Sequence, residues 1–135
     1  MDALTGLWRL VEAKAWDADG NHLPPPYGAH PTGQLAFTAE GRVLTAVCNG
    51  DAAAAPGTDR GYSSYGGRYR LAGGTLTVEV DMASDPARIG GRQVRAARLD
   101  GDTMVLRPPA RSYGGGATQQ RELTWVRVWR PREVP

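Results

Sequence analysis

The sequence is poor in several residue types, and each shortage excludes a class of protein. Its 135 residues include one cysteine, so no disulfide can form within the chain. The two histidines stand apart from any cluster of cysteines, and we expect neither a metal ion nor a cofactor. There is no run of about 18 apolar residues and no basic-then-apolar leader. We therefore expect a cytoplasmic protein that does not enter a membrane.

Lysine is also nearly absent, because Lys14 is the only one beside 15 arginines. Fourteen acidic residues leave a formal net charge of +2. The arginines are scattered along the chain, whereas a nucleic-acid-binding protein gathers them into a stripe or an arm. We therefore expect no nucleic-acid partner. The length suits one domain, which we place at residues 1–130, followed by a frayed tail at 131–135.

Helical periodicity is missing as well, since no segment keeps apolar residues at i, i+3 and i+4 for three turns. Instead, 18 glycines and 10 prolines separate short segments with period-two alternation, which is typical of strands with one buried face. The pattern predicts eight strands, at residues 7–16, 33–38, 42–48, 65–71, 75–83, 91–99, 103–107 and 119–129.

The connections between these segments alternate between short turns and long loops. In an up-and-down sheet, the short turns then fall at one end and the long loops at the other. A sheet that has no helix to cover it can close into a barrel, which removes its edges. We predict an all-β fold, a single closed up-and-down antiparallel β-barrel of about eight strands, to which one or two short strands can be added. A two-sheet sandwich with a solid core is the alternative.

The alternation also predicts which side chains face the interior. The inward residues are Trp8, Leu10, Glu12 and Lys14; Leu35 and Phe37; Tyr65, Tyr69 and Leu71; Leu76, Val78, Val80 and Met82; Arg95, Ala97 and Leu99; Met104 and Leu106; and Leu123, Trp125, Arg127 and Trp129. In the segment 42–48 both phases remain open. Tyr27, Ser112 and Tyr113 lie in loops that we expect at the mouth.

Two inward arginines need a partner, because a buried guanidinium costs several kcal/mol unless it is paired. Arg127 lies beside Trp8 if the first and last strands pair, so its guanidinium can stack on the indole and donate to terminal carbonyls. Arg95 has three open explanations. It forms an ion pair with Glu12, it faces outward if the phase is wrong by one residue, or it anchors a ligand's carboxylate, phenolate or enolate.

The order of the motifs resembles a known family. Gly6-Leu7-Trp8 with Arg127 on the last strand is similar to the lipocalin signature, in which the tryptophan and the arginine pack across the barrel floor. Further stretches resemble the small bacterial and fungal lipocalin-like domains, at residues 7–11, 17–20, 31–33, 65–69, 93–95 and 123–128.

The resemblance implies a lipocalin-type β-barrel with Gly6, Trp8 and Arg127 as its structural floor. That group includes ligand carriers as well as cofactor-free isomerases and cyclases. This sequence departs from the family pattern at residues 76–80, where members often carry histidine, and at Phe37, where they often carry tyrosine. Both departures make the cavity less polar.

Three functions are compatible with this sequence. The first is binding of a small, mostly apolar molecule in the barrel cavity through one polar anchor. Its predicted ligand-binding residues are Leu10, Glu12, Phe37, Tyr65, Tyr69, Val78, Val80, Arg95 and Trp125. The second is a cofactor-free isomerase or cyclase for a polyketide- or terpenoid-like substrate. In that case Arg95 stabilises negative charge and Tyr69 or Glu12 transfers a proton. The third is a filled barrel that serves as an interaction protein. Monomer and dimer both remain open.

Overall fold

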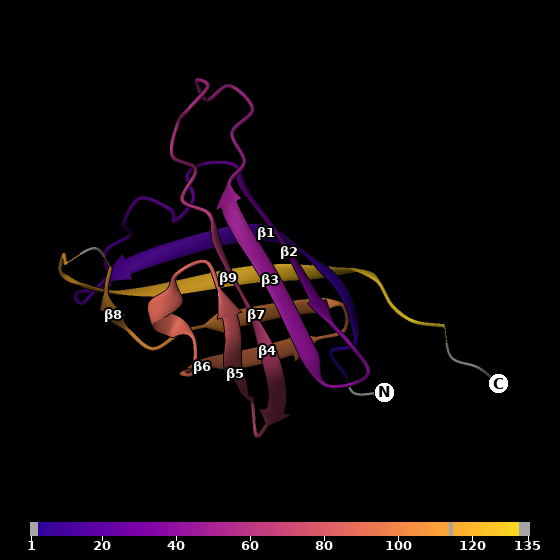
Figure 1. The fold of residues 1–135 in the computed structure, drawn as a ribbon. Helices are drawn as coiled ribbons and strands as arrows, with labels where there is room; N and C mark the ends of the chain where they lie inside the picture. The colour runs from indigo at the N-terminus through magenta and orange to yellow at the C-terminus, as the bar shows by residue number, and fades with distance from the viewer. Residues whose placement is uncertain (1–2, 114, 133–135) are drawn as a thin grey trace.

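A computed structural model describes residues 3–113 and 115–132, and most of the tail predicted at 131–135 falls outside them (Figure 1). The strands are β1 (Gly6–Asp17), β2 (Pro31–Phe37), β3 (Arg42–Asn49), β4 (Ser63–Ala72), β5 (Thr75–Ala83), β6 (Arg92–Asp100), β7 (Thr103–Arg107), β8 (Arg111–Ser112) and β9 (Thr118–Trp129), with a 3-10 turn η1 (Pro86–Arg88). The eight longer strands match the predicted segments to within two residues at each end. No helix in these ranges is long and apolar enough to span a membrane.

The strands form a closed antiparallel barrel. The order is β1-β2-β3-β4-β5-β6-β7-β9, and β1 also pairs with β9, which closes the ring. Figure 1 shows the indigo β1 and the yellow β9 running side by side. The short β8 hydrogen-bonds to β9 outside the ring. The predicted eight-stranded barrel with an extra short strand is therefore confirmed, and the sandwich is excluded.

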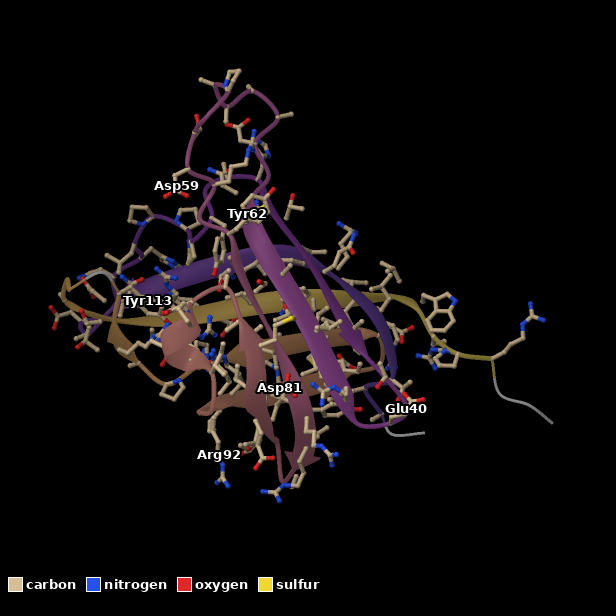
Figure 2. All side chains as sticks on the ribbon, viewed as in Figure 1. Glu40, Asp59, Tyr62, Asp81, Arg92 and Tyr113 are labelled. Carbon is tan, nitrogen blue, oxygen red and sulfur yellow. The ribbon has the colours of Figure 1, made fainter. Side chains whose placement is uncertain are left out.

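The two ends of the barrel differ, as the connection lengths predict. Short turns join β2 to β3, β4 to β5 and β6 to β7 at one end, and the long loops lie at the other. Figure 2 places Glu40, in one of the short turns, and Tyr113, in the loop after β8, at opposite ends of the molecule. We call these the closed end and the mouth.

The barrel floor at the closed end consists of Gly6, Trp8 and Arg127. Trp8 and Arg127 are register partners on β1 and β9, and the guanidinium carbon lies 4.5 Å from the indole centroid. The indole Nε1 donates to the carbonyl of Leu4 at 2.9 Å. Gly6 has φ +140°, and a Cβ there would lie 2.3 Å from the carbonyl oxygen of Trp129, so only glycine fits.

Apolar side chains fill the interior next to this floor. The inward phase of β3 is Val43, Thr45 and Val47, which settles the predicted ambiguity. The remaining buried apolar residues of this cluster include Leu10, Leu35, Phe37, Leu76, Val78, Val80, Met104, Leu106 and Trp125. Trp8 anchors this cluster at the floor, and its other members extend along the strands toward the mouth.

Three register shifts explain where the predicted phase is wrong. The shift in β1 leaves Val11 as an extra residue opposite β9, so Ala13 and Ala15 turn inward instead of Glu12 and Lys14. The side chain of Glu12 is 52% exposed and lies 3.3 Å from Lys14 Nζ. An inward Glu12 beside Arg95 is thereby excluded.

The other two shifts act in the same way on β5 and β9. Gly66 pairs with Met82 and Gly67 with Val80, so Asp81 is the extra residue and Met82 is exposed. On β9, Val128 is extra between the partners of Leu7 and Trp8. Trp129 is consequently 59% exposed, and the predictions that Met82 and Trp129 face inward are wrong.

Candidate functional site

The mouth contains a cavity of about 310 Å³, at the lower end of the ~300–1,000 Å³ typical of ligand pockets. Its apolar lining comes from the inward faces of the strands, chiefly Leu35, Val47, Leu106, Leu123 and Trp125. Its polar lining consists mainly of three tyrosines and four arginines, namely Tyr27, Tyr65, Tyr113, Arg88, Arg95, Arg111 and Arg121. The cavity is therefore more polar than the alternation pattern predicts.

Arg95 enters the cavity lining from a barrel strand. It lies on β6 with its side chain on the inward face, opposite Leu76 of β5, so the predicted phase is correct. One terminal nitrogen donates to the carbonyl of Val94 at 2.9 Å, and the other donates to the side-chain oxygen of Gln93. Burial is the main cause that lowers its pKa. Both hydrogen-bond acceptors are neutral, so they orient the guanidinium without neutralising its charge.

The other three, Arg88, Arg111 and Arg121, lie around the mouth, and we call them the rim arginines. Arg88, at the end of η1, lies 4.7 Å from the ring centroid of Tyr65 and donates to Ser63 Oγ at 3.1 Å. Arg121 of β9 and Arg111 of β8 lie 3.5 and 4.5 Å from the ring of Tyr113. Stacking on an aromatic face leaves the N–H edges of a guanidinium available to an acceptor.

Among the residues that the structure describes, none of those lining the cavity is a carboxylate. Outside the cavity, arginines pair with acids: Arg42 with Asp81, Arg92 with Glu79, Arg107 with Glu122, and Arg127 and Arg130 with Asp102. Within residues 3–113 and 115–132, none of the four cavity arginines has such a partner. The same part of the chain holds no group of three histidine, cysteine or acidic side chains that suits a metal ion.

Two buried donors in the cavity lining have no acceptor among the described residues, Nε1 of Trp125 and Nε of Arg88. A buried donor without an acceptor costs about 1–3 kcal/mol. Trp125 is only 2% exposed, whereas the indole of Trp8 in the floor does find an acceptor. A ligand atom that accepts a hydrogen bond from either donor, after a small movement of the side chains, would recover this free energy.

Tyr27 enters the cavity from the β1–β2 loop in an unusual backbone conformation. Its φ is 65°, and among the described non-glycine residues it alone has a positive φ. This left-handed conformation costs a side-chain-bearing residue roughly 1–2 kcal/mol, and such strain is concentrated at functional sites. Burial raises the pKa of its phenol, so the phenol stays protonated at neutral pH.

The structure brings together three of the nine predicted ligand-binding residues, because Tyr65, Arg95 and Trp125 line the cavity. Leu10, Phe37, Val78 and Val80 belong to the solid core below it. Tyr69 packs edge-on against Phe37, with ring centroids 4.7 Å apart, and does not reach the cavity. Of the predicted catalytic residues Arg95, Tyr69 and Glu12, only Arg95 lies in the lining.

The rim arginines are absent from the predicted site. Arg121 has a clear signal, because it continues the inward phase of Leu123, Trp125 and Arg127 by two more residues. Arg88 and Arg111 lie in the connections after β5 and β7, where no strand periodicity applies. Their position in the lining depends on how these connections fold back over the mouth.

Comparison with known proteins agrees with this architecture. The model of a family described as a lipocalin-like domain matches residues 5–128. A lipocalin-like protein from Bacteroides uniformis ATCC 8492 is similar in structure with a TM-score of 0.50 and 16% identity, covering 93% of this chain and 98% of that one. An uncharacterized protein from Bacteroides eggerthii DSM 20697 has a TM-score of 0.48 and 14% identity, with 93% and 99% covered. No match was found among curated proteins.

Proposed function

We propose that this chain, which belongs to the lipocalin-like domain family, binds a small organic acid in the cavity at the mouth. The barrel fold of this family supports small-molecule binding in general. The apolar body of this ligand lies against Trp125, Leu106 and Leu123, and its acidic group binds Arg95. The observation that carries this proposal is a partly buried arginine, held by neutral acceptors, in a cavity that no carboxylate of residues 3–113 and 115–132 lines.

The energetics favour an anion over a neutral guest. A guanidinium removed from water costs several kcal/mol when no negative charge compensates it. A ligand carboxylate can supply that charge and accept from the N–H groups that Val94 and Gln93 leave unused. The apolar lining adds about 25 cal/mol for each Å² of apolar ligand surface that it buries. An apolar acid satisfies both parts of the lining at once.

A matched pair of fluorescent probes tests the proposal. Anilinonaphthalene sulfonate carries an acidic group, and phenylnaphthylamine has the same ring body without it. We expect the sulfonate to bind at least about tenfold more tightly, as one charged hydrogen-bonded contact is worth roughly 1.5–3 kcal/mol. Arg95→Gln should abolish this preference.

Arg92→Gln is the matched control, because Arg92 lies on the same strand with its side chain 70% exposed on the outside. This variant should bind both probes as the wild type does. Equal affinity of the two probes for the wild type, or an unchanged preference in Arg95→Gln, contradicts the role of Arg95. Failure of both probes to bind contradicts the binding function.

A cofactor-free isomerase or cyclase acting on a polyketide- or terpenoid-like substrate in the same cavity is the second candidate. It is favoured by the strained Tyr27, whose protonated phenol can act as a proton donor in the cavity that Arg95 also lines. Compounds that bind would be incubated with the protein and analysed for isomers by chromatography. Tyr27→Phe should slow conversion at least about tenfold, roughly 1.4 kcal/mol of barrier, at unchanged affinity. Binding without any conversion contradicts this candidate.

A further inference from the structure

The positive charge at the mouth exceeds what a single carboxylate can compensate. Four of the 16 basic residues of the chain line one cavity of about 310 Å³, to which the described part of the chain contributes no acidic residue. Like charges gathered in a partly buried site repel one another more strongly than they do in bulk water. A singly charged guest bound at Arg95 leaves the three rim arginines without a counter-charge.

The four arginines lie at two levels. Arg95 extends from the wall of the barrel, whereas Arg88, Arg111 and Arg121 come from η1, β8 and the start of β9. Both η1 and β8 belong to the long connections at the mouth. The aromatic rings of Tyr65 and Trp125 line the same cavity, and the ring of Tyr65 also stacks against Arg88. A guest that contacts both Arg95 and the rim arginines can therefore pack its body against aromatic side chains.

The rim arginines have unused hydrogen-bonding capacity. Arg121 donates through Nε to Gln119 Oε1 at 3.1 Å, and its terminal nitrogens donate to no acceptor among the described residues. Arg88 donates to Ser63 Oγ, while its Nε is buried without an acceptor. The faces of both guanidiniums are occupied by the rings of Tyr113 and Tyr65, so their edges remain for an acidic group.

We propose that the ligand carries two acidic groups on one aromatic body, an inner group bound by Arg95 and an outer group bound by Arg88 and Arg121. This inference rests on the proposed binding function and narrows it to aromatic diacids. The length of the aromatic body separates the two acidic groups, so that one reaches the interior and the other stays at the mouth. A guest of this kind compensates charge at both levels and buries its ring against Tyr65 and Trp125.

Isothermal titration calorimetry at fixed ionic strength, with three compounds that share one ring system, tests the inference. Naphthoate carries one carboxylate, a naphthalene dicarboxylate carries one at each end, and naphthyl phosphate carries its charges on a single group. We expect the dicarboxylate to bind the wild type at least about tenfold more tightly than naphthoate, and more tightly than naphthyl phosphate. Arg121→Gln should remove most of this advantage and leave the affinity for naphthoate within about threefold.

Arg88→Gln provides a second variant of the outer site if Arg121→Gln does not fold, and Arg92→Gln on the outer surface is the control for both. Equal affinity for naphthoate and the dicarboxylate overturns the two-acid inference and leaves the binding function standing. Equal affinity for the phosphate and the dicarboxylate also overturns it, because a single group then accounts for the charge. An advantage that survives in both Arg121→Gln and Arg88→Gln overturns the outer site. If neither these compounds nor the fluorescent probes bind, the proposed function itself fails.

Discussion

At the closed end of the barrel, Arg127 has a protein partner for each of its three guanidinium nitrogens. These are Asp102 Oδ1 at 3.0 Å and the carbonyls of Thr5 and Ala3 at 2.9 Å each, while Trp8 covers its face. At the mouth, Arg95 has two neutral acceptors and no carboxylate in the described chain. The same residue type thus has its hydrogen bonds completed by protein at one end and left incomplete at the other.

This difference is the one we expect if Arg127 stabilises the fold and Arg95 binds the proposed ligand. An arginine that stabilises the fold is expected to find its acceptors within the chain, because unpaired buried charge is costly. The tryptophans follow the same division, since Trp8 Nε1 has an acceptor and Trp125 Nε1 has none among the described residues. The arginine and the tryptophan whose hydrogen bonds are incomplete both lie at the mouth, where the long loops are.

The largest difference between the two ends is expected when Arg127 and Arg95 are each replaced by methionine. Arg127→Met removes two charge-assisted hydrogen bonds to backbone carbonyls and a cation–π contact, and should lower the free energy of unfolding by about 2–4 kcal/mol. Arg95→Met removes an uncompensated, partly buried charge together with two hydrogen bonds to neutral acceptors, so it should leave the free energy of unfolding unchanged or raise it. Urea denaturation followed by tryptophan fluorescence measures both. An equal loss in the two variants would show that Arg95 is also structural.

A smaller effect is expected when each buried tryptophan becomes phenylalanine. Both substitutions delete the same atoms, but Trp8→Phe also removes the hydrogen bond to the Leu4 carbonyl. Trp8→Phe should therefore cost about 1 kcal/mol more than Trp125→Phe, the usual net value of one hydrogen bond. Thermal and urea unfolding of the pair measure this difference. A larger cost for Trp125→Phe would mean that its indole N–H has an acceptor in solution.

The closed end could be predicted from the sequence, and the mouth largely could not. Period-two alternation and the spacing of short turns depend on local geometry alone, so they located the strands, the closure of the ring and the pairing of Trp8 with Arg127. The alternation failed wherever one extra residue shifted the register, at Val11, Asp81 and Val128. A bulge of this kind leaves no mark in the pattern of polar and apolar residues, so the alternation wrongly places Glu12 inside the barrel.

The mouth depends on information that alternation does not contain. Arg121 can be predicted from the sequence, because it continues the inward phase of β9. Arg88 and Tyr27 come from connections whose conformations depend on contacts with distant strands, such as the stacking of Arg88 on Tyr65. Prediction from periodicity therefore gives the container and its floor, whereas the chemistry of the opening requires the folded loops.

The smallest expected effect concerns stability in acid. It involves two carboxylates at opposite ends of the barrel, Asp102 at the closed end and Asp17 at the mouth. Hydrogen bonds from Arg130 and Arg127 lower the pKa of Asp102 below its usual 3.8, and hydrogen bonds from Asn21 lower that of Asp17. A lowered pKa adds stability that is present above the usual value and is lost as the pH falls through the folded value. Asp102→Asn and Asp17→Asn should each flatten the loss of stability below about pH 4.

Because salt screens charges, added salt should weaken only the contribution of Asp102, whose partners are cations. Urea denaturation at several pH values, with and without salt, measures this difference, and equal salt sensitivity of the two contributions would contradict it.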